Sequence, residues 1–374
     1  MQQDVKLVRD VSPYIRKEWT SRRVMIDVLI ALIPVVVFAI YRFGHHSLIR
    51  MIVGVLAAVL AEALVFPLSQ KVDRKAEGKL QKFLSRYKNF NTLNIFTAAV
   101  TGLILALQLP AQINIYVVVM GAFFAIIIGK MVFGGTGNNI FNPAVLGRVF
   151  VALAFGTFFQ ASGIYPGIDA AAGATPLTAL KGTVDGQTTY FLGQTLSSYS
   201  LLDLFIGNVP GSMGEISALA ILLGAAYLII RRAADWKTML AVIAPVAVLA
   251  VFAGLGSPHV ANGQILNFVL FHVLSGGLIF GAVFMATDPV TSPLHISSKL
   301  LFGLLIASLT MLNRLFGPMP EGVAFSILFA NMLVPSLDRI RVFKNRFTWQ
   351  FGVTYGVAIL VMILIVFFGV GGAF

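Results

Sequence analysis

The chain has 374 residues, of which 58% are hydrophobic and only 11% are charged. A soluble chain would carry about 25% charged residues, so the composition excludes an ordinary soluble enzyme. No cysteine is present, which excludes disulfides and cysteine-bound iron–sulfur clusters. The net charge of +12 does not indicate nucleic-acid binding, because the basic residues lie between apolar runs without interleaved aromatic residues.

Apolar runs long enough to cross about 30 Å of hydrocarbon as helices recur along the whole chain. The sequence predicts eleven such spans, at 24–43, 48–68, 93–110, 115–133, 145–161, 216–231, 238–256, 265–286, 300–316, 322–337 and 350–371. The predicted fold is an all-α polytopic membrane protein.

The basic residues predict how these spans are oriented. If the N-terminus is cytoplasmic, every Lys and Arg except Arg42, Arg50, Lys181 and Arg314 falls at the cytoplasmic side. Cytoplasmic loops of membrane proteins are enriched in Lys and Arg. We therefore expect a cytoplasmic N-terminus and a loop at 162–199 outside the membrane.

Five segments follow from this map. They are a cytoplasmic segment at 1–23, a five-span unit at 24–161, the outer loop at 162–199, a second five-span unit at 200–338, and a basic segment with one extra span at 339–374. Pro- and Gly-containing interruptions at 129–148, 207–215 and 285–299 indicate broken helices. Because the first unit begins inside and the second outside, the two units are expected to be inverted repeats around a ten-span core.

One interruption, GGTGNNIFNPA at 134–144, is rich in glycine and carboxamides. It lacks the Gly-Lys-Ser/Thr of a P-loop. The glycines Gly134, Gly135 and Gly137 favour a tight re-entrant turn, and Pro143 favours the start of the next helix. Asn139 and Asn142 can both donate and accept hydrogen bonds, so they suit the edge of a ring that carries both N–H and C=O groups.

Two acids lie within or beside the predicted spans. Glu62, in AAVLAEALVF, is a candidate for an ion path, although no partner can be identified for it. Asp288, in MATDPVTSP, is either a partner of Lys299 or Lys130 at a helix end or part of an ion path with the nearby threonine hydroxyls.

Four motifs in order carry a family resemblance: FGGTGNNIFNPAVLGR (133–148), DAAAGATPL (169–177), GSMGEISALAILLG (211–224) and FMATDPVTSP (284–293). Together they resemble the D subunit of the Rnf ferredoxin:NAD oxidoreductase and the B subunit of the sodium-pumping NADH:quinone oxidoreductase. The resemblance implies a protein of a bacterial cytoplasmic membrane that works within a multisubunit complex.

The resemblance also implies a covalent cofactor in DAAAGAT. In these families the motif reads Asp-x-x-Ser/Thr-Gly-Ala-Thr, and its last Thr carries FMN through a phosphoester bond. The matching residues are Asp169, Gly173, Ala174 and Thr175, whereas Ala172 replaces the usual hydroxyl residue. The alternative is a flexible small-residue loop. Thr175 would be only the acceptor, because a separate flavin transferase supplies the catalytic groups.

A second flavin, non-covalent riboflavin, is implied near the inner face, with Gly135, Thr136, Asn139 and Asn142 as its contacts. The implied partners are the A, B, C, E and G subunits of the Rnf complex, the membrane lipid, and Na⁺ or H⁺. Those proteins would provide the iron–sulfur clusters, a second covalent FMN, and the ferredoxin and NAD sites. We expect no metal site and no catalytic side chain in this chain itself.

The expected function is passage of electrons between ferredoxin and NAD through these flavins, coupled to ion translocation. The short N-terminal segment favours the D type over the quinone-reducing B type. Broken helices and repeated halves are also typical of a solute transporter or channel. A purely structural anchor for other proteins of a complex is a third possibility.

Overall fold

The computed structural model of the chain describes residues 20–70, 78–156, 176–177, 181–184, 187–190, 200–258, 260, 262–317, 322–339 and 349–371. The first half contains α1 (Ser21–Phe43), α2 (His45–Ser69), α3 (Lys79–Ser85), α4 (Thr92–Leu107), α5 (Ile115–Ile126), the π-helical turn η1 (Ile127–Met131) and α6 (Pro143–Ala154). A short antiparallel hairpin, β1 (Lys181–Val184) and β2 (Gln187–Tyr190), follows.

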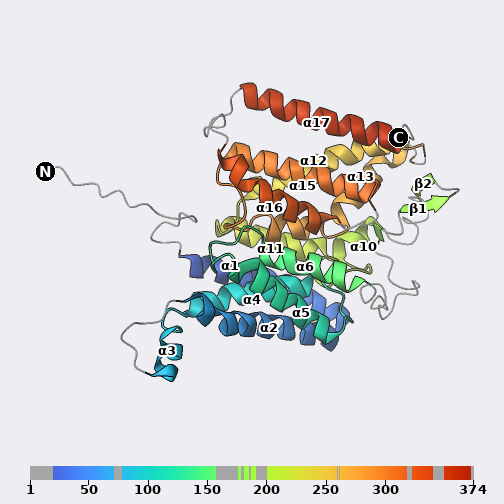
Figure 1. Cartoon of the computed structure of the whole chain (residues 1–374). Coiled ribbons are helices and arrows are strands. Elements are labelled where there is room, and N and C mark those ends of the chain that lie inside the picture. The colour runs from blue at the N-terminus through green and yellow to red at the C-terminus, as the bar shows by residue number, and fades with distance from the viewer. Residues whose placement is uncertain are drawn as a thin grey trace.

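The second half is also helical. It contains α10 (Leu201–Ile206), α11 (Ala218–Ile230), α12 (Trp236–Gly256), the 3-10 turn η2 (Asn262–Gln264), α13 (Ile265–Leu274), α14 (Leu278–Phe280), the π-helical turn η3 (Gly281–Met285), α15 (Ile296–Leu315), α16 (Val323–Arg339) and α17 (Trp349–Val370). In Figure 1 the long helices lie side by side, with α2 at one edge of the bundle and α17 at the other.

A helix or a bent helix pair lies in each of the eleven predicted ranges. Five helices are long and apolar enough to cross a membrane alone, namely α1, α2, α12, α15 and α17. A sixth candidate is α13 with α14 and η3, bent by 54° at its break. These helices confirm the multi-pass character. The remaining apolar helices are shorter, so the full count of eleven crossings stays a prediction.

The surface of the bundle supports a membrane setting. Large apolar side chains are exposed along the outward faces of the long helices, for example Val37 at 59%, Leu60 at 57% and Leu64 at 62%. Exposed apolar surface on this scale is unusual for a soluble protein. It is the surface expected where lipid tails replace water.

Two details of the elements differ from the prediction. The predicted loop at 162–199 contains the β1–β2 hairpin, a small non-helical element in an otherwise helical fold. Asp185-Gly186 between two Thr-containing runs was the signal that was missed, because Asp-Gly favours tight hairpin turns. The fifth span was predicted to reach residue 161, but α6 ends at Ala154 and the residues just beyond 156 lie outside the described part.

Small residues let the helices approach closely. A Cβ added to Gly102 on α4 would overlap the backbone of Gly54 on α2, and one added to Gly224 on α11 would overlap Ala31 on α1. Gly303 on α15 meets Ala241 on α12 in the same way. In lipid, association of helices depends on such close contact.

The break between α13 and α14 illustrates how irregular backbone is satisfied inside the bundle. Gly276 and Gly277 both have positive φ, which residues with a Cβ rarely adopt. The buried guanidinium of Arg314 donates hydrogen bonds to the carbonyls of His272, Ser275 and Gly276. The carbonyls freed by the break therefore have a donor where no water is available.

Candidate functional site

A hollow opens between the two halves of the bundle, and we call it the central hollow. It is lined by Met25, Val28, Thr97, Val100, Thr101, Ile104, Lys130, Thr136, Gly137, Asn139, Asn142, Pro143, Ala144, Leu228, Ala233, Ala234, Val283, Phe284, Thr287, Asp288, Pro289 and Val290. Its cavity volume is about 90 Å³. The total empty space is about 770 Å³ when the open mouth is included. A ligand of several rings would therefore require flexible side chains such as Met25 to move.

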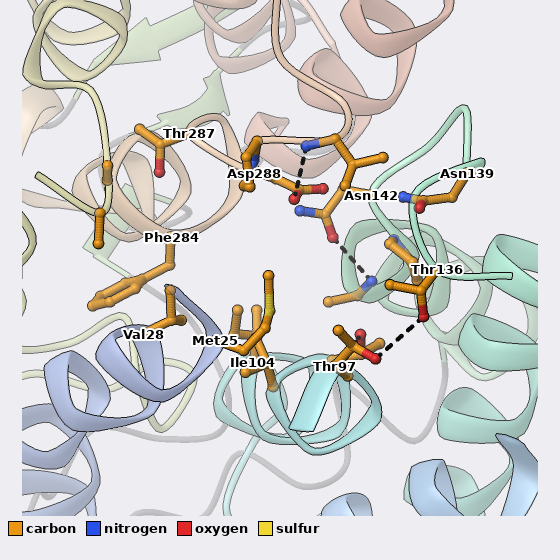
Figure 2. Close-up of a pocket in the computed structure, with 18 of the residues that line it drawn as sticks. Met25, Val28, Thr97, Ile104, Thr136, Asn139, Asn142, Phe284, Thr287 and Asp288 are labelled. Carbon is orange, nitrogen blue, oxygen red and sulfur yellow. Dashed lines mark hydrogen bonds between the residues drawn. The ribbon is translucent and has the colours of Figure 1, made fainter. Parts of the chain in front are cut away.

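The central hollow has an apolar side and a polar side. Figure 2 shows Met25, Val28, Ile104 and Phe284 along one side. Hydroxyl, carboxamide and carboxyl groups from α4, the 134–142 turn and the 286–290 turn lie along the other (Figure 2). Such a pairing of apolar walls with a few polar groups is typical of sites for flat heteroaromatic ligands.

The strongest interaction at this site is a buried ion pair. The ammonium Nζ of Lys130 lies 2.5 Å from Oε2 of Glu62 and donates to Thr97 Oγ1 at 2.7 Å. Both side chains are almost fully buried, at 3% and 1% exposed. The second carboxylate oxygen of Glu62 accepts from Asn94 Nδ2 at 3.0 Å. The pair is thus hydrogen-bonded on both partners, as a buried pair must be to offset its loss of hydration.

This pair corrects the expectation that Glu62 lacks a partner. Glu62 comes from α2 and Lys130 from η1, while Asn94 and Thr97 come from α4. Lys130 lines the central hollow but Glu62 does not. The positive end of the pair therefore faces the hollow, and the negative end lies behind it.

The glycine-rich segment forms the tight turn that the sequence predicted. Gly134, Gly135 and Gly137 have φ of 107°, 91° and 93°. The turn places Thr136 with its hydroxyl 3.4 Å from that of Thr97 (Figure 2). Asn139 donates to the carbonyl of Phe141 at 3.1 Å and lines the central hollow beside Thr136.

Asn142 has a structural role that was not predicted from the sequence. Its Oδ1 caps α6 by accepting from the N–H groups of Ala144 and Val145, and its Nδ2 donates to the carbonyl of Met285 at 3.2 Å. Its own N–H donates to Asn331 on α16. Asn142 therefore joins the two halves and keeps only one N–H for a ligand.

Asp288 is not paired with either lysine suggested for it. Lys130 binds Glu62, and Lys299 binds Asp235 at 2.5 Å. Asp288 instead accepts from Thr291 Oγ1 at 2.9 Å and from the N–H of Val290. It closes the 286–290 turn and lines the central hollow together with Lys130.

The predicted covalent site lies outside the described residues, since Asp169, Gly173, Ala174 and Thr175 are not among them. The next two residues are described, and both are buried. Leu177 is 3% exposed and contacts Gly276 at the break between α13 and α14. The chain is thus anchored to the bundle two residues after Thr175.

The groups that line the central hollow can bind and orient a ligand. Within the described ranges, no group of three or more His, Asp or Glu residues could hold a metal ion. The hollow offers a cation, several hydroxyls, carboxamides and a carboxyl group. These groups can orient a ligand and adjust its electrostatic environment.

Comparison with known proteins identifies the family to which the chain belongs. The model of the NQR2, RnfD, RnfE family matches residues 8–347. The chain is 36% identical over 332 residues to the D subunit of the proton-translocating ferredoxin:NAD(+) oxidoreductase complex of Clostridium ljungdahlii, covering 88% of this chain and 92% of that protein. It is 33% identical to the D subunit of the Na(+)-translocating counterpart in Acetobacterium woodii, covering 90% and 94%.

A B-type relative matches over a shorter range. The B subunit of the Na(+)-translocating NADH-quinone reductase of Chromohalobacter salexigens is 41% identical over 248 residues, which cover 66% of this chain and 58% of that protein. The match to the two D-type relatives therefore extends nearly end to end, whereas the match to this B-type relative does not.

The buried ion pair gives a prediction about stability. Lys130→Met or Glu62→Leu alone should lower the free energy of unfolding by about 3–5 kcal/mol, because each leaves a buried charge without its partner. The double variant should lose much less, since it leaves neither charge behind. Unfolding of the purified protein in detergent measures all four members of this cycle. A loss in the double variant equal to the sum of the two single losses would contradict the pairing.

Proposed function

Because the chain belongs to the NQR2, RnfD, RnfE family, we propose that it is the D subunit of an ion-translocating ferredoxin:NAD oxidoreductase complex. It is a multi-pass membrane component of a complex of this type. The observation that carries the D assignment is the nearly end-to-end match to two D-type relatives. One of these relatives is named for protons and the other for Na⁺, so the proposal includes either coupling ion.

In this proposal the protein passes electrons between two flavins on opposite sides of the membrane. The bound flavins supply the redox chemistry, and the protein positions them and sets their potentials. FMN would be attached at Thr175 in the loop that the charge distribution assigns to the outside. Riboflavin would lie in the central hollow, formed by helix ends assigned to the cytoplasmic side. The other proteins of the complex would exchange electrons with these two sites.

Attachment at Thr175 requires a transferase acting on FAD. The Thr175 hydroxyl forms a phosphoester bond to the FMN half as the phosphoanhydride of FAD breaks and AMP leaves. Gly173 and Ala174 have small side chains, so they would hinder a transferase little, and Leu177 joins this segment to the bundle two residues after Thr175.

The shape and charge of the central hollow support the proposal that the inner flavin binds there. Its apolar side suits the ring system, and Thr136, Asn139 and the remaining N–H of Asn142 suit the ring edge. Lys130 adds a cation where negative charge increases when a flavin is reduced. A positive group near the ring favours the reduced form.

Two halves with the same order of helix contacts support the proposed inverted repeats. In the first half α2 contacts α4 and α5, and α5 contacts α6. In the second half α12 contacts α13 and α15, and α15 contacts α16. The matching helices α1 and α11 contact each other, as do α6 and α16. The central hollow would then lie at the interface of the repeats, where many transporters bind their ligands.

Thr175→Ala should abolish covalent flavin while leaving an assembled, membrane-inserted protein. The readout is ultraviolet fluorescence of this chain after denaturing electrophoresis of the complex. Thr178→Ala, three residues along the same segment, is the matched control and should remain fluorescent. Fluorescence that persists in Thr175→Ala would show that Thr175 is not the acceptor.

The inner flavin's reduction potential should respond oppositely to the two halves of the ion pair. Glu62→Gln leaves the Lys130 ammonium uncompensated, so the potential should rise. Lys130→Met leaves the Glu62 carboxylate uncompensated, so the potential should fall. A redox titration of the acid-extractable flavin in the purified complex, followed by absorbance, measures both shifts.

Lys299→Met is the control for this titration, because it breaks an ion pair of the same length that does not line the central hollow. It should leave the potential unchanged. Shifts in the same direction for Glu62→Gln and Lys130→Met would indicate a general disturbance and would refute an electrostatic role for the pair.

A further inference from the structure

A second hollow lies on the outer surface of the bundle, between α12, α15 and α17, and we call it the side groove. Its cavity volume is about 460 Å³, compared with about 90 Å³ for the central hollow. The side groove is lined mostly by apolar side chains and is partly open at the surface of the bundle. An apolar group could enter it from the lipid.

The groove lies along the part of α17 between two buried residues, Phe351 in its first turn and Val366 near its end. Near the end of α17, a Cβ added to Gly256 of α12 would overlap the Phe367 backbone, and Val366 is fully buried. Towards the beginning of α17, Tyr355 and Ile359 line the groove, and its floor includes the small side chain of Ala244. This helix lies beyond residues 8–347, which the family model matches, so the groove is an addition to the family core.

The mouth of the groove is basic. Lys237 and Trp236 lie there, at the first turn of α12. Burial acts to raise the pKa of the nearby Asp235 carboxyl, but hydrogen bonds from Lys299 and from the Lys237 N–H hold that pKa below its usual value. Asp235 thus stays ionised and is engaged by Lys299. In the described part of the chain Lys237 forms no ion pair, although its charge also helps to lower the Asp235 pKa, and it lines the mouth of the groove.

We propose that the side groove binds one acyl chain of an anionic phospholipid whose phosphate is held by Lys237. The apolar length of the groove fits the acyl chain, and Trp236, which is 51% exposed, fits the interfacial position that tryptophan prefers. Basic pockets between membrane helices on the cytoplasmic side commonly hold anionic lipid headgroups.

Native mass spectrometry of the intact complex tests this proposal. The complex is purified in detergent with phosphatidylglycerol or phosphatidylcholine added at equal concentration. The unaltered complex should retain one phosphatidylglycerol more than Ala244→Trp, in which the new ring fills the groove. Val357→Trp introduces the same side chain on an exposed face of α17 outside the groove and should retain the lipid. Lys237→Gln should weaken its retention about fivefold.

Three results would overturn the proposal. The first is equal lipid retention by the unaltered complex and Ala244→Trp. The second is equal retention of phosphatidylcholine and phosphatidylglycerol. The third is a different occupant, either a quinone in the extracted lipid or a helix of another protein of the complex crosslinked to a photoreactive group at position 359. Flavin content of each variant is measured in parallel, so loss of the flavins would be distinguished from loss of lipid.

Discussion

The buried Lys130–Glu62 ion pair constrains the relative positions of three elements in the first half of the bundle. Removing two charges from water costs several kcal/mol per ion, and only close geometry and further hydrogen bonds offset that cost. Here α2 and η1 supply the charges, and Asn94 and Thr97 of α4 supply the hydrogen bonds. These three elements must therefore hold their relative positions. The close contact between Gly54 of α2 and Gly102 of α4 brings these two helices near enough for the hydrogen bonds to form.

The two halves are joined by a polar connection that lies next to this pair. Asn142 caps α6 and bonds to the Met285 carbonyl, and Asn331 of α16 bonds to Asn142 and to the Thr291 carbonyl. Polar groups in the non-helical turns beside the central hollow thus have hydrogen-bond partners within the protein. Backbone of this kind survives at membrane depth only when it is buried in protein or lines a cavity. A ligand placed between the turns would contact both halves of the protein at once.

Much of this was predictable from sequence, because local composition determines where apolar helices and glycine turns occur. The ranges of the helices, the 134–137 turn and the family all followed from residues that are close together in the chain. The partner of Glu62 could not be predicted in this way, because Lys130 is 68 residues away and only the folded bundle brings the two together. The sequence Asn-Pro-Ala is compatible with the helix cap that Asn142 forms, but the cap was not predicted; its contact with a ligand stays a prediction. Lys299 was one of two lysines suggested as a partner of Asp288, whereas it pairs with Asp235, which starts a different helix.

In the proposed mechanism one chain holds two flavins, one covalent and one removable, on the two sides of the membrane. The most direct measurement is the flavin content of the purified protein. Acid precipitation separates extractable riboflavin from bound FMN, and mass spectrometry of the peptide that contains Thr175 measures the latter. We expect one riboflavin released and one FMN on that peptide for each chain. An extract without flavin, or an unmodified Thr175 peptide from the assembled complex, would contradict this mechanism.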